Sequence, residues 1–336
     1  MTALLTVFGF VCSIALTYLM RCYSLKYDVL DMPVARSSHE TPTPRGGGMA
    51  IYATVMLLLI IPGWLNQLDW SLILTIAIPG SMVAFIGFWD DHHPINSSHR
   101  LIVHSLAAIV ALWLLPGIPE LSFSHHIVSN PFVLLPLYAG GLVWLLNLYN
   151  FMDGIDGIAG AEAITTLLAA AAILYFNHET EWLPLLFWVA APIGGFLLWN
   201  WAPAKIFMGD GGSGFLGFLL GMLALITSAY SILNIWTWLI LFAVFISDTT
   251  WTLIVRFTSG QDWHQAHRSH SYQILARKMG SHAVISHGVI IINLIWLTPI
   301  AAMTAYRPEY GWLLALLAYF PLLIICWFCD AGQQQQ

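Results

Sequence analysis

The sequence predicts an all-α integral membrane protein with about eleven membrane-spanning helices. Three observations lead to this fold class. Hydrophobic residues make up 59% of the 336 residues and charged residues only 8%, and the mean hydropathy is +0.76. That much apolar surface exceeds what one soluble core can bury. The apolar residues also fall into runs of about 20, the length that an α-helix needs to cross a bilayer.

The apolar runs define the expected spans in order along the chain. The first is a retained span rather than a signal peptide, because no small-residue cleavage site follows it and Arg21 and Lys26 come after it. Each later run is a predominantly apolar stretch of similar length, the fourth being the shortest. The expected spans are 2–20, 48–65, 70–89, 101–116, 131–149, 158–176, 183–199, 214–231, 234–255, 283–304 and 311–328.

Two kinds of connection alternate between these spans. One set is long or rich in Gly, Pro and polar residues, namely 21–47, 90–100, 150–157, 200–213 and 256–282. The other set is short or bland, namely 66–69, 117–130, 177–182, 232–233 and 305–310. Only Arg307 among the Lys and Arg residues falls in the second set. The first set holds Arg21, Lys26, Arg36, Arg45, Arg100, Lys205, Arg256, Arg268, Arg277 and Lys278.

The basic residues predict the orientation in the membrane. Because cytoplasmic loops carry the excess of Lys and Arg, we expect the first set of connections inside, the N-terminus outside and the C-terminus inside. One span more or fewer would scatter the basic residues over both faces. Residues 1–330 form a single expected transmembrane domain, and 331–336 form a polar tail.

Composition also excludes several classes of protein. The four cysteines lie in or beside apolar segments as two pairs, which fits neither a disulfide framework nor a zinc site. The 16 tryptophans are typical of interfacial anchors and lipid-facing surface, and they do not indicate a stacking platform. We therefore expect no nucleic-acid partner.

Five aspartates stand where expected spans meet the same face. Asp90 and Asp91 lie in "FWDDHHPINSSHR", Asp153 and Asp156 in "NLYNFMDGIDGIAG", and Asp210 in "KIFMGDGGSGFLG". Each alone could simply cap a helix start. An adjacent pair such as Asp90 and Asp91 is repulsive unless a cation or basic groups compensate. Together the five predict a divalent-metal site on this face.

The ligand types indicate the metal and its partner. Carboxylate and amide oxygens suit Mg²⁺, or Mn²⁺, and Mg²⁺ usually completes its shell with water and substrate phosphate. Glycines agree with a phosphate partner, because "GDGGSG" includes Gly211 at a helix start and "PTPRGGG" carries Arg45. Glycine clusters also allow close helix packing in membranes, so these glycines could serve either phosphate binding or packing.

The last connection of the first set, "QDWHQAHRSHSYQILARK", is rich in basic side chains. It holds His264, His267, Arg268 and His270. A zinc site and a solvated loop are both alternatives. An arginine within the cluster and the absence of cysteine favour an anion site, in which imidazoles and guanidinium bind phosphate oxygens.

These motifs, in this order, resemble the polyprenyl-phosphate N-acetylhexosamine-1-phosphate transferase family. The resemblance rests on P-R-G-G-G, then D-D, N-x-x-N-x-x-D-G-x-D-G, F-M-G-D-x-G-S and the His-rich loop, and it covers nearly the whole chain. "HRSHSYQ" and "DDHHPINSSHRL" are most similar to members that initiate O-antigen synthesis. The family resemblance implies a bacterial inner-membrane enzyme. Such an enzyme transfers sugar 1-phosphate from a UDP-sugar to undecaprenyl phosphate and releases UMP, with Mg²⁺.

The resemblance also implies a role for each site residue. Asp210 matches the metal ligand, assisted by Asn150. Phe207 matches the aromatic that stacks on uracil, and Asp156, with Asp153 nearby, matches the nucleotide-reading position. Asp90 and Asp91 match the catalytic pair at the lipid phosphate. The residues expected to bind phosphate groups are Arg45, Arg100, Gly211, His264, His267, Arg268 and His270.

Two other classes of membrane protein also use carboxylates within the bilayer. A cation-coupled transporter also carries intramembrane carboxylates, and Asp248 and Glu162 lie inside expected spans. An intramembrane aspartyl protease needs two aspartates within the bilayer. Both are disfavoured because the carboxylates cluster on one face and no internal repeat is visible. The sequence leaves the sugar open among UDP-FucNAc, UDP-GlcNAc and UDP-N-acetylquinovosamine types, and it favours the first two. It also leaves open the prenyl chain length and the oligomeric state, with a homodimer as one option.

Overall fold

The computed structural model describes residues 1–33, 41–262 and 267–333 of the chain. Arg36 and His264, both named above, lie outside the described residues. The main helices are α1 (Thr2–Lys26), α2 (Gly48–Trp64), α3 (Trp70–His92), α4 (Ser97–Leu114), α5 (Pro131–Met152), α6 (Ile158–Phe176), α7 (Leu183–Asn200), α8 (Asp210–Ala229), α9 (Ile235–Leu241), α10 (Ala243–Thr258), α11 (Ser271–Met279), α12 (His282–Ile291), α13 (Thr298–Tyr306) and α14 (Gly311–Phe328).

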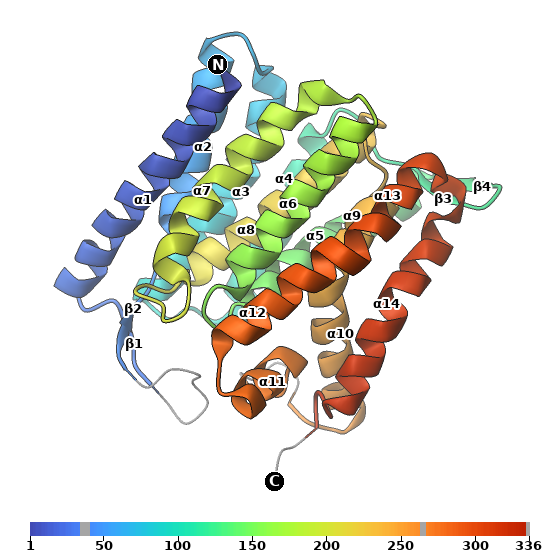
Figure 1. Ribbon diagram of the computed structural model, residues 1–336. Coiled ribbons are helices and arrows are strands. Elements are labelled where there is room, and N and C mark those ends of the chain that lie inside the picture. The colour runs from blue at the N-terminus through green and yellow to red at the C-terminus, as the bar shows by residue number, and fades with distance from the viewer. Residues whose placement is uncertain (34–40, 263–266, 334–336) are drawn as a thin grey trace.

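Shorter elements complete the described chain. A π-helical turn, η2 (Ile292–Leu297), joins α12 to α13, so these three elements form one continuous span. Two antiparallel strand pairs lie at opposite ends of the bundle, as Figure 1 shows. These pairs are β1 (Leu30–Asp31) with β2 (Thr43–Pro44), and β3 (Leu121–Phe123) with β4 (His126–Val128). The 3₁₀ turns are η1 (Thr180–Trp182) and η3 (Pro308–Tyr310).

The helices confirm the predicted fold class, an all-α multi-pass membrane protein. Within the described ranges, nine helices are long and apolar enough to cross a membrane, and α9 with α10, bent by 73°, adds a tenth candidate. The apolar helix α2, with 17 residues, is slightly shorter than these. Each expected span therefore corresponds to one helix or to one continuous or bent set of helices (Figure 1).

Helix α8 lies at the centre of the bundle. It is the most buried of the candidate spans in the described chain, with 89% of an 18-residue stretch buried, and it packs against α3 and α5. Close approach needs small residues, because a Cβ on Gly217 would lie 2.7 Å from the Leu145 carbonyl oxygen. The helix that begins at Asp210 is thus held between α3, which carries Asp91 in its last turn, and α5, which carries Asn150 in its last turn.

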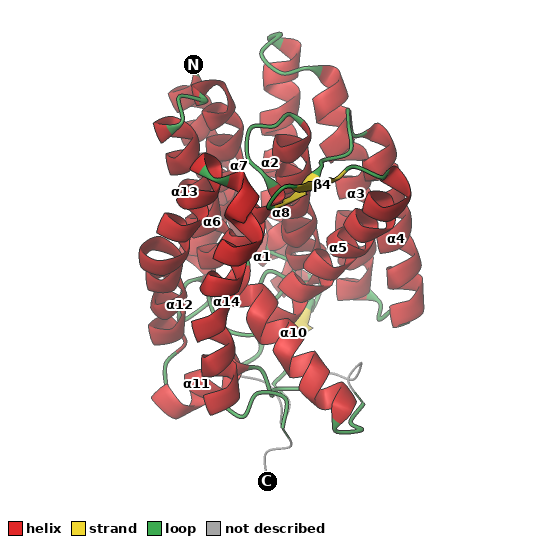
Figure 2. Ribbon diagram, turned by 90° about the vertical axis from the view of Figure 1, so that its right-hand side faces the viewer, coloured by secondary structure: helices red, strands yellow, loops and turns green. Residues whose placement is uncertain are grey.

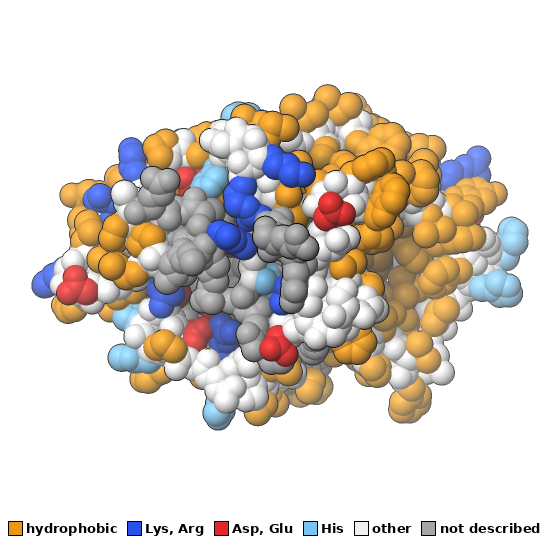
Figure 3. Space-filling view, turned by 90° about the horizontal axis from the view of Figure 1, so that it is seen from below, with side chains coloured by type: hydrophobic (Ala, Val, Ile, Leu, Met, Phe, Trp, Pro, Cys, Tyr) orange, Lys and Arg blue, Asp and Glu red, His pale blue; other side chains and the backbone are white. Residues whose placement is uncertain are grey.

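The two ends of the bundle differ in character. The N-terminus lies at the upper end of Figure 1, whereas the C-terminus, α11 and the β1–β2 pair lie at the lower end, and Figure 2 shows the same arrangement from the side. We call the lower end the C-terminal face. The connections expected to be cytoplasmic meet at this face, and Lys and Arg side chains gather around its middle in Figure 3.

Two helices that carry site residues, α3 and α8, extend further into polar sequence than the hydropathy predicts. The expected spans end at residue 89 and begin at residue 214, but α3 continues to His92 and α8 begins at Asp210. Hydropathy marks where apolar side chains stop, whereas a helix continues as long as its backbone hydrogen bonds are made. Asp91 and Asp210 are consequently helical residues with fixed positions.

The two carboxylates noted inside expected spans have partners within the protein. The fully buried Glu162 accepts a hydrogen bond of 2.6 Å from the side-chain amide of Asn293 in η2, which also donates to Thr165 Oγ1 at 2.7 Å. Asp248, in α10, accepts the backbone N–H groups of Ser271 and Tyr272, each at 2.9 Å. Asp248 therefore caps the start of α11 from another helix.

Candidate active site

A carboxylate from α3 caps the start of α8. The Asp91 side chain is completely buried, and its two oxygens accept the backbone N–H groups of Asp210 at 3.0 Å and Gly211 at 3.3 Å. A negative charge is favourable at a helix N-terminus, where the first N–H groups lack partners within the helix. Gly209, with φ of +78°, passes so close that a Cβ would lie 2.6 Å from Asp91 Oδ2. Asp91 thereby fixes where Asp210 stands.

A glycine in α3 makes this contact sterically demanding. A Cβ on Gly87 would lie 2.5 Å from the Gly211 nitrogen and 2.6 Å from the Asp210 carbonyl carbon. Gly87→Ala should therefore force α3 and α8 apart and lower the free energy of unfolding by about 1–3 kcal/mol. Denaturant unfolding in detergent measures this. Gly140→Ala is the matched control because nothing lies within 4 Å of that Cβ, and equal stability of the two variants would contradict the prediction.

The segment before α2 places Arg45 beside Asp91. The Arg45 Nη2 atom donates to the Asp91 carbonyl oxygen at 2.5 Å, and Nε lies 3.8 Å from Asp91 Oδ1. Backbone hydrogen bonds join this segment to the chain before α8: Phe207 N–H donates to the Pro44 carbonyl at 2.8 Å, and Gly47 N–H donates to the Phe207 carbonyl at 2.9 Å. The pairing brings two segments more than 150 residues apart in sequence to one edge of the site.

Arg100 bridges two of the five aspartates. Its Nη1 atom donates to Asp90 Oδ2 at 2.5 Å and to Asp210 Oδ2 at 2.6 Å. The other oxygen of Asp90 accepts the Ile95 N–H at 2.6 Å. Because the side chains of Arg100 and Asp210 are 30% and 32% exposed, this pair is open to ligands, whereas Asp91 is not.

Asn150 and Asp153 border the same cluster. The side-chain amide of Asn150 donates to Ser213 Oγ at 3.0 Å, on the first turn of α8, and also lies within hydrogen-bond reach of Asp210. Burial, together with the nearby carboxylates of Asp210, Asp156 and Asp91, raises the pKa of Asp153 well above its ordinary value. Asp153 therefore lies close to the other aspartates. An additional ionised carboxylate in this cluster is unfavourable unless a cation is bound beside it.

Asp156 lies between three segments. Its Oδ2 accepts the Ala204 N–H at 2.9 Å, its Oδ1 lies 3.4 Å from His282 Nδ1, and its carbonyl accepts the Ser286 hydroxyl at 3.0 Å. Sequence reasoning missed His282 and Ser286. They lie outside the recognised motifs, and only the placement of α12 against α6 brings them to Asp156.

The described part of the His-rich loop forms a packed stack. The rings of His267 and His270 stack with centroids 4.9 Å apart, and His270 Nδ1 lies 3.2 Å from Asp248 Oδ1. Burial and the neighbouring His270 and Arg256 lower the pKa of His267 to about 3. His267 is thus a neutral imidazole at neutral pH, able to donate one hydrogen bond. His270 is almost completely buried and serves this packing.

Tyr272 joins the loop to the aspartate cluster. Its hydroxyl donates to the Phe151 carbonyl at 2.9 Å, two residues before Asp153. A Cβ on Gly154, the residue after Asp153, would overlap this hydroxyl. The start of α11 therefore lies against the end of α5, next to the aspartates.

The donor set is compatible with a magnesium ion that a substrate helps to bind. In the described ranges, no three His, Cys, Asp or Glu side chains are arranged to enclose a metal ion by themselves. Mg²⁺ in phosphate-transfer sites needs only one or two carboxylates, because water and substrate phosphate complete its shell. The exposed Asp210 carboxylate beside the Asn150 amide provides such a partial site.

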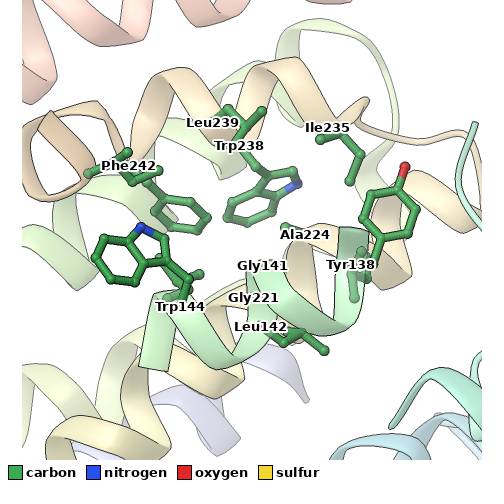
Figure 4. Close-up of a pocket in the computed structure, with 13 residues that line it drawn as sticks. Tyr138, Gly141, Leu142, Trp144, Gly221, Ala224, Ile235, Trp238, Leu239 and Phe242 are labelled. Carbon is green, nitrogen blue, oxygen red and sulfur yellow. The ribbon is translucent and has the colours of Figure 1, made fainter. Parts of the chain in front are cut away.

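An apolar cavity of about 130 Å³ lies within the bundle, between α5, α8 and the bent pair α9–α10. Figure 4 shows Trp144, Trp238 and Phe242 around this cavity, with Tyr138 at its far end. Its lining is almost wholly apolar, and Gly141 and Gly221 leave space on the α5 and α8 sides. The cavity suits a hydrocarbon chain rather than a polar ligand.

The structure brings Asp90, Asp91, Arg100, Asp210 and Asn150 together at the C-terminal face. An arginine can bind phosphate directly, and carboxylates can do so through a divalent cation. Fold and site thus define a multi-pass membrane protein with a cluster of carboxylates and an arginine at one end of its helix bundle.

The glycosyl transferase family 4 model matches residues 72–228. A probable undecaprenyl-phosphate N-acetylglucosaminyl 1-phosphate transferase of Bacillus subtilis is 28% identical over 83% of this chain and 78% of its own length. A phospho-N-acetylmuramoyl-pentapeptide-transferase of Petrotoga mobilis is 31% identical over 63% of this chain and 68% of its own length. An undecaprenyl-phosphate alpha-N-acetylglucosaminyl 1-phosphate transferase of Yersinia pestis is 30% identical over 63% of this chain and 59% of its own length. The chain belongs to this family, the polyprenyl-phosphate hexosamine-1-phosphate transferases. The comparisons do not support the transporter alternative.

Proposed function

We propose that this protein transfers N-acetylhexosamine 1-phosphate from a UDP-sugar to undecaprenyl phosphate at the cytoplasmic face of the bacterial inner membrane. The observation that carries the proposal is the Asp90–Arg100–Asp210 cluster, held at the end of the bundle by Asp91. A lipid phosphate and a soluble nucleotide can meet only at the bilayer surface, and the residues of this cluster stand at the ends of α3, α4 and α8. Relatives named for undecaprenyl phosphate support the lipid acceptor.

The reaction forms one phosphorus–oxygen bond and breaks another. An oxygen of the lipid phosphate attacks the sugar-bearing phosphorus of the UDP-sugar, the bond from that phosphorus to the bridging oxygen breaks, and UMP leaves with the oxygen. A lipid monophosphate is largely ionised at neutral pH, since its second pKa is about 6, so little general-base help is needed. The principal obstacle is repulsion between two anionic substrates, which cationic groups must offset.

The chain offers residues for each part of this task. We assign Asp210 and Asn150 to a bound Mg²⁺, or Mn²⁺, which would neutralise charge on the diphosphate. Arg100 lies beside Asp210 and would contact the phosphates directly. Asp90 and Asp91 are expected from the family resemblance to be the catalytic pair at the lipid phosphate; we assign them positioning roles instead, because Asp90 holds Arg100 and the buried Asp91 caps α8. The nucleotide is assigned to Phe207, Asp153 and Asp156, and the diphosphate also to Arg45, His267 and Arg268.

The apolar cavity has room for only a short stretch of an isoprenoid chain. We propose that part of the undecaprenyl chain lies there, with the rest in the surrounding lipid and the phosphate at the C-terminal face. The donor sugar is of the UDP-GlcNAc or UDP-FucNAc type, and the product would initiate O-antigen or another cell-surface polysaccharide. The two relatives named for N-acetylglucosaminyl transfer favour UDP-GlcNAc.

Release of UMP tests the proposal and its metal requirement. Purified protein in detergent, with undecaprenyl phosphate, Mg²⁺ and a panel of UDP-N-acetyl sugars, should release UMP only when lipid and metal are both present. EDTA should abolish release, and added Mg²⁺ should restore it, because Asp210 and its neighbours concentrate negative charge that a cation must balance. A folded protein that neither releases UMP with any sugar nor binds UDP would overturn the proposal.

A further inference from the structure

The C-terminal segment, residues 329–332, touches the His-rich loop. The Gly332 N–H donates to the Ser269 carbonyl at 2.8 Å, and the fully buried Ala331 donates its N–H to the Cys326 carbonyl at 3.1 Å. Ser269 stands between Arg268 and His270 in the sequence, and its hydroxyl lies 3.0 Å from His267 Nδ1. One loop residue thus contacts the C-terminal segment through its backbone and His267 through its side chain.

A side chain from the end of α10 holds the other side of Gly332. The Gln261 amide nitrogen donates to the Gly332 carbonyl at 3.0 Å, while the Gln261 amide oxygen accepts a hydrogen bond of 2.9 Å from Arg256. Arg256 belongs to the last turn of α10. A chain of hydrogen bonds therefore runs from α10 through Gln261 and Gly332 to Ser269 and His267.

Only glycine fits at position 332. Its φ is +84°, and a Cβ would lie 2.7 Å from the Thr252 carbonyl oxygen and 2.8 Å from Val255 Cβ. Both contacts belong to α10, so no flexible side-chain end can move aside. The C-terminal segment is fitted against α10 rather than lying loosely on it.

We propose that Gly332 and Gln261 are positioning residues that hold the His-rich loop ready for the diphosphate of the sugar donor. The inference rests on the proposed function and adds residues to it. A loop fixed before binding loses less conformational freedom when the anion arrives, which improves affinity without a new contact. The hydrogen bond from Gly332 holds Ser269, and Ser269 in turn orients the His267 ring and sets the path of Arg268.

Positioning and a merely structural anchor predict different kinetics. If the contact positions the loop, its loss should raise KM for the UDP-sugar and leave KM for undecaprenyl phosphate and kcat nearly unchanged. If it only supports the fold, its loss should reduce the amount of active protein, which lowers the maximal rate and leaves both KM values unchanged. The two KM values therefore decide between these roles.

The test uses two variants of the full chain and one matched control. Gly332→Ala adds a methyl group where the backbone and side chain of α10 leave no room for one. Gln261→Glu keeps the oxygen that accepts from Arg256 but loses the amide group that donates to the Gly332 carbonyl. Gly280→Ala is the control, because Gly280 also has a positive φ of +64° but has nothing within 4 Å of its Cβ. Hydrogen exchange of the backbone around Ser269 and initial rates of UMP release are measured for each.

We expect faster exchange of the loop in both test variants and a KM for the UDP-sugar that is about two- to tenfold higher, the range for one lost hydrogen bond. The control should match the parent in both. Unchanged exchange and KM in Gly332→Ala, or a loss confined to maximal rate, would overturn the inference. Absence of UMP release by the parent would instead overturn the proposed function, so the two failures are distinguishable.

Discussion

Asp91→Asn should reduce UMP release by about a hundredfold, the loss that misplacing a reacting group by about 1 Å can cause. Asparagine keeps one oxygen for the Asp210 N–H but turns an NH₂ group toward the Gly211 N–H, where two donors repel. It also removes the charge that favours the α8 N-terminus and leaves Arg45 without its carboxylate. Asp210 would then shift with the first turn of α8.

Rates of UMP release and thermal unfolding in detergent measure this effect. We expect the free energy of unfolding to fall by about 1–2 kcal/mol, the usual range for losing a helix cap. Asp69→Asn is the matched control, because Asp69 stands at the start of the same helix, is exposed and makes no side-chain capping hydrogen bond. Normal turnover in Asp91→Asn would show that the cap does not position the site.

The spans could be predicted from sequence because hydropathy depends on local composition. The same is true of the face that the aspartates share, since alternating connections must lie on alternating sides. The helix ends at Asp91 and Asp210 could not be predicted in this way. Their extra turns depend on each other, since the carboxylate of one helix satisfies the backbone of the other.

Contacts between distant segments account for what sequence reasoning missed. Asp248 looked like a carboxylate within the membrane, but it caps α11, which begins 23 residues later. Gly332 belonged to a stretch expected to be a polar tail, yet it lies against α10 and the His-rich loop. No local pattern marks either residue, because the partner is chosen by the packing of α10, α11 and the C-terminal segment.

Arg100→Ala should lower UMP release by about a hundredfold or more, comparable to the loss of one preorganised charge-stabilising donor. The guanidinium lies between Asp90 and Asp210, so its removal leaves two carboxylates facing each other across a partly buried space. It also removes the cation closest to Asp210 and so to the incoming phosphates. Both effects raise the barrier to bringing two anionic substrates together.

Arg100→Lys separates charge from geometry. A lysine restores the positive charge but offers a single point rather than a planar fork, so it should recover part of the activity and remain below the parent. Lys205→Ala controls for positive charge at the same face, because Lys205 packs over the Trp199 ring at 5.5 Å and is not paired with these aspartates. If Lys205→Ala lost as much activity as Arg100→Ala, general attraction of anions to this face would explain the effect. If Arg100→Lys were as inactive as Arg100→Ala, the bridging geometry of the guanidinium would be the essential feature.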